Sequence, residues 1–338
     1  MRAIWKSSLS LLTALTITSI AVPAKAAAQC GDLNLVTSLD LRTLPSGRPA
    51  IDGMIGDTPE TFLIDTGGVI SMVTSRTVRE LKLTTTTNRR MALTGVNGAS
   101  TQTVAQLPSI TIGRYRQQGV YFFVMRVRDD PSDTTQPEFA GLIAPDFLQN
   151  FDADFDFAQK KLNLISPDHC AGKVQYWSAP SIAIVSMTMD SAGHIKFPMT
   201  LDGRRVNALL DTGASTTTLN LTVARQQFDV DPNAPDVEKV GELSGGYSAS
   251  VYRRRFKTLA FEGVVINNPM IDLLPDLMGG QVAAAPRTGS IIREDRGIPE
   301  VILGMTTLNQ LHLYIAYKER KVYITAAGTA PGPTSPAQ

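Results

Sequence analysis

One stretch of the chain occurs twice. The first copy reads Thr61-Phe62-Leu63-Ile64-Asp65-Thr66-Gly67-Gly68, and the second reads Asn207-Ala208-Leu209-Leu210-Asp211-Thr212-Gly213-Ala214. In each copy an apolar run ends in an acid, a threonine and a glycine. The apolar run predicts a buried strand, and the glycine allows a tight turn and the close approach of another segment. Two such strands together predict a site with paired carboxylates.

The sequence around each acid is duplicated as well. Each acid strand follows a hairpin turn, at Gly56-Asp57 in the first half and at Asp202-Gly203 in the second. A short predicted helix comes next, with Thr74 or Asn220 as its N-cap residue. Each half then closes with an apolar segment and two strands around a polar turn, which occupy residues 141–148 and 155–164, and again 301–308 and 315–324. The chain is therefore a duplicated, strand-rich domain.

The N-terminus has the layout of a secretory signal. Arg2 and Lys6 precede an apolar stretch over residues 9–22, and small residues follow at 24–28. The apolar stretch is short for a membrane span, which needs about 20 apolar residues. We expect residues 1–26 to be a signal peptide, so that the protein is exported to the periplasm or secreted and keeps no stable membrane span. An uncleaved anchor is the alternative.

The length of 338 residues exceeds what one hydrophobic core usually supports. We expect a first lobe over residues 27–168 and a second lobe over 187–325. An irregular linker over 169–186 would join them, and residues 326–338, rich in Gly, Pro, Thr and Ser, would form a disordered tail.

Composition excludes some classes of partner. Hydrophobic residues make up 43% of the chain and charged residues 19%, as in ordinary globular proteins. The formal charge of +1 gives no reason to expect nucleic acid or an anionic membrane as a partner.

The remaining titratable residues suggest no metal site. His169, His194 and His312 are too scattered for a metal site, and we expect surface or packing roles for them. The acids Asp152, Asp154 and Asp156 alternate along a predicted strand whose polar face would point outward. They lack the glycine that a calcium-binding loop needs.

The two cysteines, Cys30 and Cys170, form an even set in a chain predicted to be exported. An oxidising compartment favours their pairing. Closing so long a loop would stabilise the fold by about 4–5 kcal/mol in the loop-entropy model. Two unpaired buried thiols are the alternative.

These repeated elements resemble the aspartic proteases, and the retropepsin-like branch most closely. The resemblance rests on the two Asp-Thr-Gly turns and on Ile302-Leu303-Gly304, and it covers essentially the whole chain after the signal. It implies a mainly β protein with two homologous retropepsin- or pepsin-like β-barrel lobes, related by a pseudo-twofold axis, with the active site at the lobe interface. It also implies an aspartic endopeptidase that acts on peptides or proteins without a cofactor. Because one chain carries both acids, we expect a monomer.

The resemblance assigns roles to the residues of the two turns. Asp65 and Asp211 would be the catalytic pair. The supporting residues would be Thr66, Gly67, Thr212 and Gly213, whose hydroxyls bond across the interface and whose glycines let the turns lie against each other. Two carboxylates about 3 Å apart cannot both be ionised, as aspartic proteases illustrate. One acid can then activate a bound water while the other protonates the substrate carbonyl.

A glycine-bearing hairpin lies downstream of each acid and resembles a flap, which in this family closes over the bound peptide. The flap residues would be Gly95, Val96, Asn97 and Gly98 in the first half, and Gly245, Gly246 and Tyr247 in the second. Ordinary surface hairpins are the alternative.

The first turn departs from the family pattern. Gly68 and Val69 stand where small or hydroxylic residues are usual, and Ala144 stands where the second half has Gly304. We hypothesise that the absent methyl at Gly68 makes room for the methyl of Ala144. These departures keep open the alternative of a catalytically weak or inactive homologue that serves as a peptide-binding envelope protein. An anchored or assembly-linked structural component is a third interpretation.

Overall fold

The structure is a computed structural model of the chain. It describes residues 30–87, 93–94, 100–127, 138–243, 249–275 and 299–328. The predicted signal peptide and most of the predicted tail lie outside the described residues. No helix within the described ranges is long and apolar enough to cross a membrane.

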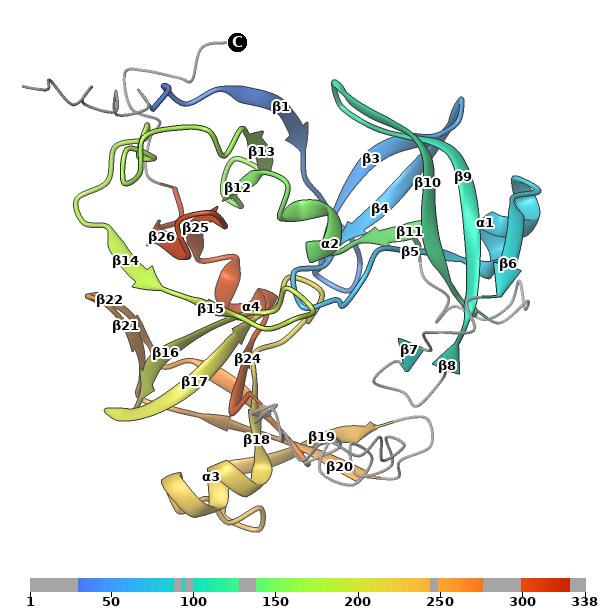
Figure 1. The fold of residues 1–338 in the computed structure, drawn as a ribbon. Helices are drawn as coiled ribbons and strands as arrows, with labels where there is room; N and C mark the ends of the chain where they lie inside the picture. The colour runs from blue at the N-terminus through green and yellow to red at the C-terminus, as the bar shows by residue number, and fades with distance from the viewer. Residues whose placement is uncertain are drawn as a thin grey trace, which may run out of the picture.

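The first lobe is built on one sheet with the strand order β2-β3-β4-β11-β5-β10-β9-β6. Strand β3 also pairs with β9, so the sheet curls back on itself. The strands span Arg42–Thr43 (β2), Pro49–Ile55 (β3), Thr58–Ile64 (β4), Met72–Thr74 (β5), Thr84–Thr87 (β6), Thr103–Ile112 (β9), Tyr115–Met125 (β10) and Gly141–Ile143 (β11). A separate pair, β7 (Leu93–Thr94) with β8 (Ser100–Thr101), projects beside it (Figure 1).

The second lobe repeats this plan in the sheet β19-β20-β23-β18-β24-β17-β16-β21-β22, with β15 added to β16. Its strands span Thr188–Met189 (β15), Ile195–Leu201 (β16), Arg204–Leu210 (β17), Thr218–Asn220 (β18), Val237–Leu243 (β19), Ala249–Arg255 (β20), Thr258–Phe261 (β21), Val264–Asn267 (β22), Met270–Leu274 (β23) and Val301–Leu303 (β24). The predicted class, mainly β with two pepsin-like barrel lobes, is confirmed.

A third sheet joins the lobes, with the order β1-β13-β12-β25-β26-β14 (Figure 1). Its strands span Leu35–Asp40 (β1), Asp152–Asp156 (β12), Lys161–Ile165 (β13), Ala183–Ser186 (β14), Leu311–Ala316 (β25) and Lys321–Ala326 (β26). Strand β12 from the first repeat pairs directly with β25 from the second. Strand β14 pairs with β26, so the end of the segment predicted as an irregular linker is a strand.

Four short helices are described, and the predicted caps are confirmed. They span Ser75–Glu80 (α1), Pro145–Leu148 (α2), Leu221–Phe228 (α3) and Met305–Leu308 (α4). The Thr74 hydroxyl accepts a hydrogen bond from the Thr77 amide at 3.1 Å, and the Asn220 side chain accepts from the amides of Thr222 and Val223. Each cap satisfies amides that a helix start leaves free.

The prediction that β12 turns its acids outward is wrong. Asp152 and Asp154 are 1% and 0% exposed, and Asp156 is buried as well. The acidic face is covered by the segment after β13, where Trp177 stacks on His312 with ring centroids 4.4 Å apart. This cover comes from distant parts of the chain, which strand alternation alone does not reveal.

Histidines and tyrosines form hydrogen bonds with two of these buried acids. The His169 ring lies 2.6 Å from an Asp152 oxygen, and the Tyr314 hydroxyl donates to the same oxygen at 3.1 Å. The His312 ring lies 2.6 Å from Asp154, which also accepts hydrogen bonds from Asn163 and Tyr176. The side chains of His169 and His312 are therefore buried partners of carboxylates, whereas His194 pairs with the exposed Asp190.

The predicted disulfide between Cys30 and Cys170 is present, across a sequence separation of 140 residues. Beside it, Gly31 forms a β-bridge with His169. The bridge therefore fastens the start of the described chain next to the edge of the sheet that joins the lobes.

Candidate active site

Both acids stand where a strand ends against a parallel neighbour. Strand β4 runs parallel to β11, and β17 runs parallel to β24. The Asp65 amide donates to the Ile143 carbonyl at 2.9 Å, and the Asp211 amide donates to the Leu303 carbonyl at 3.1 Å. The two copies thus place their acids by the same backbone arrangement.

Four buried hydrogen bonds lock the two turns together. The Thr66 hydroxyl donates to the Leu210 carbonyl at 3.0 Å and accepts from the Thr212 amide at 3.0 Å. The Thr212 hydroxyl donates to the Ile64 carbonyl at 2.7 Å and accepts from the Thr66 amide at 3.1 Å. Each threonine is 0% exposed, so its hydroxyl is fully committed to the opposite lobe.

The glycine of each turn lies against the acid of the other. A Cβ at Gly67 would clash with the carboxyl group of Asp211, and a Cβ at Gly213 would clash with that of Asp65. The Gly67 amide donates to its own Asp65 at 3.0 Å, and the Ala214 amide donates to Asp211 at 3.0 Å. Only glycine permits this mutual approach.

Each carboxyl group lies against the glycine of the opposite turn, so the two acids are close enough for each to influence the pKa of the other. Burial raises the pKa of both, and the charge of Asp65 helps to raise the pKa of Asp211 to about 7. The backbone amides oppose this shift by stabilising the ionised form. The arrangement can therefore hold one shared proton up to near-neutral pH.

A hydroxylic residue after each turn braces the site, and the sequence analysis did not single these residues out. The Ser71 amide and hydroxyl both donate to Asp146, at 2.9 and 2.7 Å, and the Ala144 amide donates to the Ser71 oxygen. In the second lobe, the Thr217 amide donates to the Thr306 hydroxyl at 2.9 Å. The internal repeat, which aligns Ser71 with Thr217, is the signal that could have found them.

Arg48 is a second residue that the sequence analysis missed. Its guanidinium is half-buried, lies 5.6 Å from the ring centroid of Phe139 and donates to the Ser46 hydroxyl at 2.9 Å. The positive charge acts on both Asp65 and Asp211, and it lowers the pKa of Asp65 against the larger effect of burial. No ion pair with Arg48 is seen among the described residues.

Gly68 and Ala144, two of the residues at which the first copy departs from the family pattern, lie next to each other in the structure. A Cβ built at Gly68 would lie 3.2 Å from the Ala144 Cβ and 3.2 Å from the Asp65 carboxyl carbon. This is the contact that the compensation hypothesis requires, although the effect on activity stays a prediction. Val69 is 45% exposed beside the dyad.

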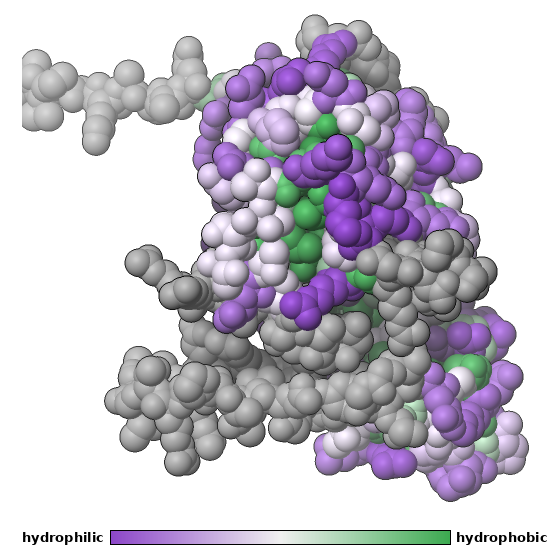
Figure 2. All heavy atoms as spheres, turned by 90° about the vertical axis from the view of Figure 1, so that its right-hand side faces the viewer, coloured by the Kyte–Doolittle hydropathy of each residue, from purple (hydrophilic) through white to green (hydrophobic). Residues whose placement is uncertain are grey.

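The predicted flap tips, residues 95–98 and 245–247, lie outside the described residues. Their stems are described: β7 pairs with β8, and β19 pairs with β20. Figure 2 views the molecule from the side on which both hairpins project, and it shows a strip of apolar atoms on the first lobe bordered by hydrophilic ones. The described ranges hold no group of acids, histidines and cysteines arranged to bind a metal.

A protein-family model agrees with this arrangement. The model described as "Aspartyl protease" matches residues 51–147 and 197–307, which include both acids and the strands β11 and β24 that run parallel to the acid strands. No curated protein matches the chain.

Proposed function

The chain belongs to the aspartyl protease family, and from this premise we propose that it is an exported endopeptidase in which Asp65 and Asp211 activate a water molecule. The observation that carries the proposal is the mutual contact of the two turns. Each acid lies against the glycine of the other turn, and the raised pKa of Asp211 supports a pair with one proton.

The proposed reaction needs only the pair and water. The ionised carboxylate takes a proton from the water while the water oxygen attacks the peptide carbonyl carbon, and the protonated carboxyl donates its proton to the carbonyl oxygen. The tetrahedral intermediate then collapses: its C–N bond breaks, the nitrogen takes a proton from one acid, and a hydroxyl proton returns to the other. The pair ends with one proton, as it began.

The proton held by the pair sets the expected pH dependence. Because the pKa of Asp211 is raised to about 7, the singly protonated pair persists from acid pH to about neutral. We expect cleavage to decline above pH 7 as that proton is lost.

The proposed compartment is the periplasm or the external medium. The Cys30–Cys170 disulfide supports this, since such bridges persist in oxidising compartments. Both acids come from one chain, which supports a monomeric enzyme acting on peptide or protein substrates.

Cleavage of a reduced, alkylated protein between pH 3 and 8 tests the proposal. We expect fragments from the wild type and a loss of about 10²–10⁴-fold in Asp65→Asn and Asp211→Asn. Asp57→Asn, at an exposed hairpin turn, should cleave as the wild type does. Pepstatin provides an independent check.

Cleavage that persists in both active-site variants would overturn the assignment of the pair. If the wild type cleaved at no pH, the peptide-binding homologue would be favoured. Equal binding of a peptide to the wild type and to Asp65→Asn, without turnover, would identify that alternative.

A further inference from the structure

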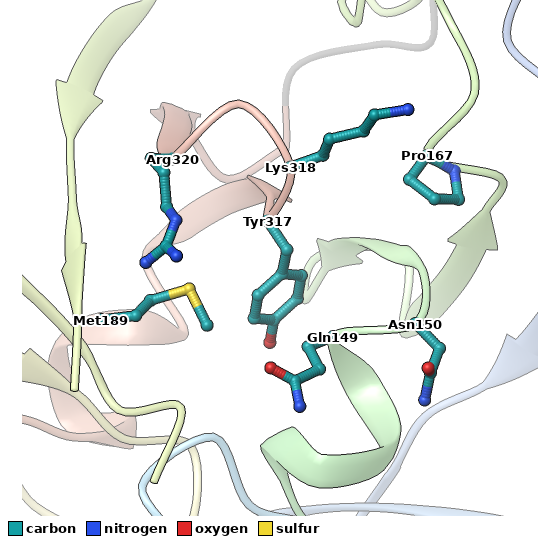
Figure 3. A pocket seen from close by; sticks show the side chains of 7 residues that line it. All are labelled: Gln149, Asn150, Pro167, Met189, Tyr317, Lys318 and Arg320. Atoms are coloured by element: carbon teal, nitrogen blue, oxygen red, sulfur yellow. The ribbon is translucent and has the colours of Figure 1, made fainter. Parts of the chain in front are cut away.

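A pocket of about 360 Å³ lies where the two repeats meet in the shared sheet (Figure 3). Gln149, at the end of α2, contributes from the first repeat. Met189 of β15 and the turn between β25 and β26 contribute from the second. None of these residues belongs to the aspartate site.

The centre of the pocket is the side chain of Tyr317. It is 5% exposed, yet its hydroxyl forms no hydrogen bond with any described residue. Figure 3 shows the hydroxyl pointing toward Gln149, with Met189 and Arg320 on one side of the ring and Asn150 and Pro167 on the other. Burial, and to a smaller extent the charge of Asp152, raises the pKa of this phenol, so the group remains a donor. A buried donor without a partner destabilises the folded state.

The internal repeat shows that this hydroxyl is not needed for packing. The equivalent turn between β12 and β13 carries Phe157 in place of Tyr317 and Ala158 in place of Lys318. Both turns have the same backbone, because Lys160 and Arg320 adopt φ angles of 53° and 57° and each donates its amide to the aromatic residue's carbonyl. The second copy has thus added a hydroxyl donor and a cation to a turn that folds without them.

The charges around the pocket are mainly positive. The Arg320 guanidinium forms no ion pair among the described residues, and Lys318 pairs only with the exposed Asp168, at 3.0 Å. Glu319 points away, since its carboxylate accepts from the Gly172 amide and the Tyr323 hydroxyl. Asp190, which follows Met189, is paired with His194 and Lys196, and Asp152 is paired with His169.

We propose that this pocket binds a small oxyanion, a carboxylate or phosphate group, with the Tyr317 hydroxyl and the Arg320 guanidinium as donors. The bound group would satisfy the unpaired phenol and place its charge beside the arginine, since charge-assisted hydrogen bonds are the stronger kind. Because the pocket walls come from both repeats, the ligand would also stabilise the junction between the lobes. This proposal does not depend on proteolytic activity.

The test is thermal unfolding of the full chain in sodium phosphate or sodium citrate, against sodium chloride at equal ionic strength. A ligand that binds only the folded state raises the melting temperature in a saturable way. We expect such a rise for the wild type. In Tyr317→Phe and Arg320→Gln the apparent affinity should fall by about tenfold or more. Comparing the two anions shows which group the pocket prefers.

Two further measurements distinguish a loss of anion binding from a general loss of stability. Without the anion, Tyr317→Phe should be at least as stable as the wild type, because it removes an unpaired buried hydroxyl and keeps the ring that Phe157 supplies in the first copy. Tyr115→Phe, whose hydroxyl donates to Gln117 at 3.1 Å in the first lobe, should keep the full response to the anion. No saturable shift in the wild type, or equal shifts in all variants, would overturn the proposal.

Discussion

The residues of the two Asp-Thr-Gly turns are almost symmetric, and Arg48 is a charge that breaks this symmetry. It acts on both acids, and among the described residues it has only the Ser46 hydroxyl and the Phe139 ring as side-chain partners. Since a nearby cation favours the ionised carboxylate, Arg48 opposes the effect of burial on the pair. Arg48 therefore helps to set the pH range in which the pair of acids holds one proton.

Replacing Arg48 should move the pH profile. In Arg48→Gln the pKa values of the pair rise, so both limbs of the activity profile should shift upward by about 0.5–1 pH unit. Arg48→Lys keeps the charge and should retain most of the wild-type profile. Arg42→Gln, which breaks the exposed pair with Asp52, is the matched control. A uniform loss of kcat without a shift would mean that Arg48 acts only through packing.

Gly68 and Ala144 are a second difference between the two repeats, because the second copy has Ala214 and Gly304 at the equivalent positions. A methyl at Gly68 would be 3.2 Å from both the Ala144 Cβ and the Asp65 carboxyl carbon, which is tighter than ordinary contact. Gly68→Ala should therefore cost about 1–3 kcal/mol of stability and lower kcat/KM. Adding Ala144→Gly should restore much of both, and a double-mutant cycle measures the coupling. If Gly68→Ala alone changed neither quantity, the compensation hypothesis would fail.

The paired acids were predictable because a strand that ends in Asp-Thr-Gly is a local signal that appears twice. Arg48 was not, because its role depends on a hairpin that folds back over Phe139, far along the chain. Ser71 and Asp146 are similar: the hydrogen bonds between them span 75 residues and have no local pattern.

Strand β12 is the clearest case in which the local sequence pattern does not predict the burial of a strand face. Its alternation of acids and apolar residues is typical of a half-exposed strand. In the structure, β13 and β25 flank it and the segment carrying Trp177 covers its acidic face. The acids are tolerated there because each accepts at least one hydrogen bond, which is the usual condition for burying a polar group. The burial follows from residues such as His312, 158 positions away.

The pairing of Asp152 with His169 predicts a pH-dependent stability. Burial alone would lower the pKa of His169, but the hydrogen bonds to Asp152 and to the Cys170 carbonyl outweigh it and the pKa is raised. A raised pKa in the folded state gives stability that is complete below the unfolded value of about 6.5 and is lost as pH rises through the folded value. Burial also raises the pKa of Asp152, which acts in the same direction.

Melting temperatures from pH 5 to 9 check this prediction. The wild type should lose more stability than His169→Gln as pH rises above about 6.5. The test compares the melting curve of the wild type with that of His169→Gln. Both proteins keep the active-site acids, whose raised pKa also makes stability fall as pH rises, so only the difference between the two curves reports on His169. Arg42→Gln, at the exposed pair with Asp52, is the control and should parallel the wild type. Parallel curves for His169→Gln as well would contradict the prediction.

At the scale of the whole molecule, the two repeats are not independent domains. In the sheet β1-β13-β12-β25-β26-β14, the strands of the first repeat meet those of the second where β12 pairs with β25, and the threonine hydrogen bonds at the active site join the repeats a second time. The two junctions lie in different parts of the fold, so separating the lobes exposes both the dyad and the buried acids of β12. We therefore expect the two lobes to unfold together.

We therefore expect a single unfolding transition, with the same midpoint by far-UV circular dichroism and by the fluorescence of the buried Trp177. Replacing Cys30 and Cys170 by serine should lower stability by about 4 kcal/mol, because the disulfide closes a loop of 140 residues. That change should shift the transition without splitting it, since both lobe junctions remain. Two resolved transitions in the wild type, one for each repeat, would show that the shared sheet does not couple the lobes.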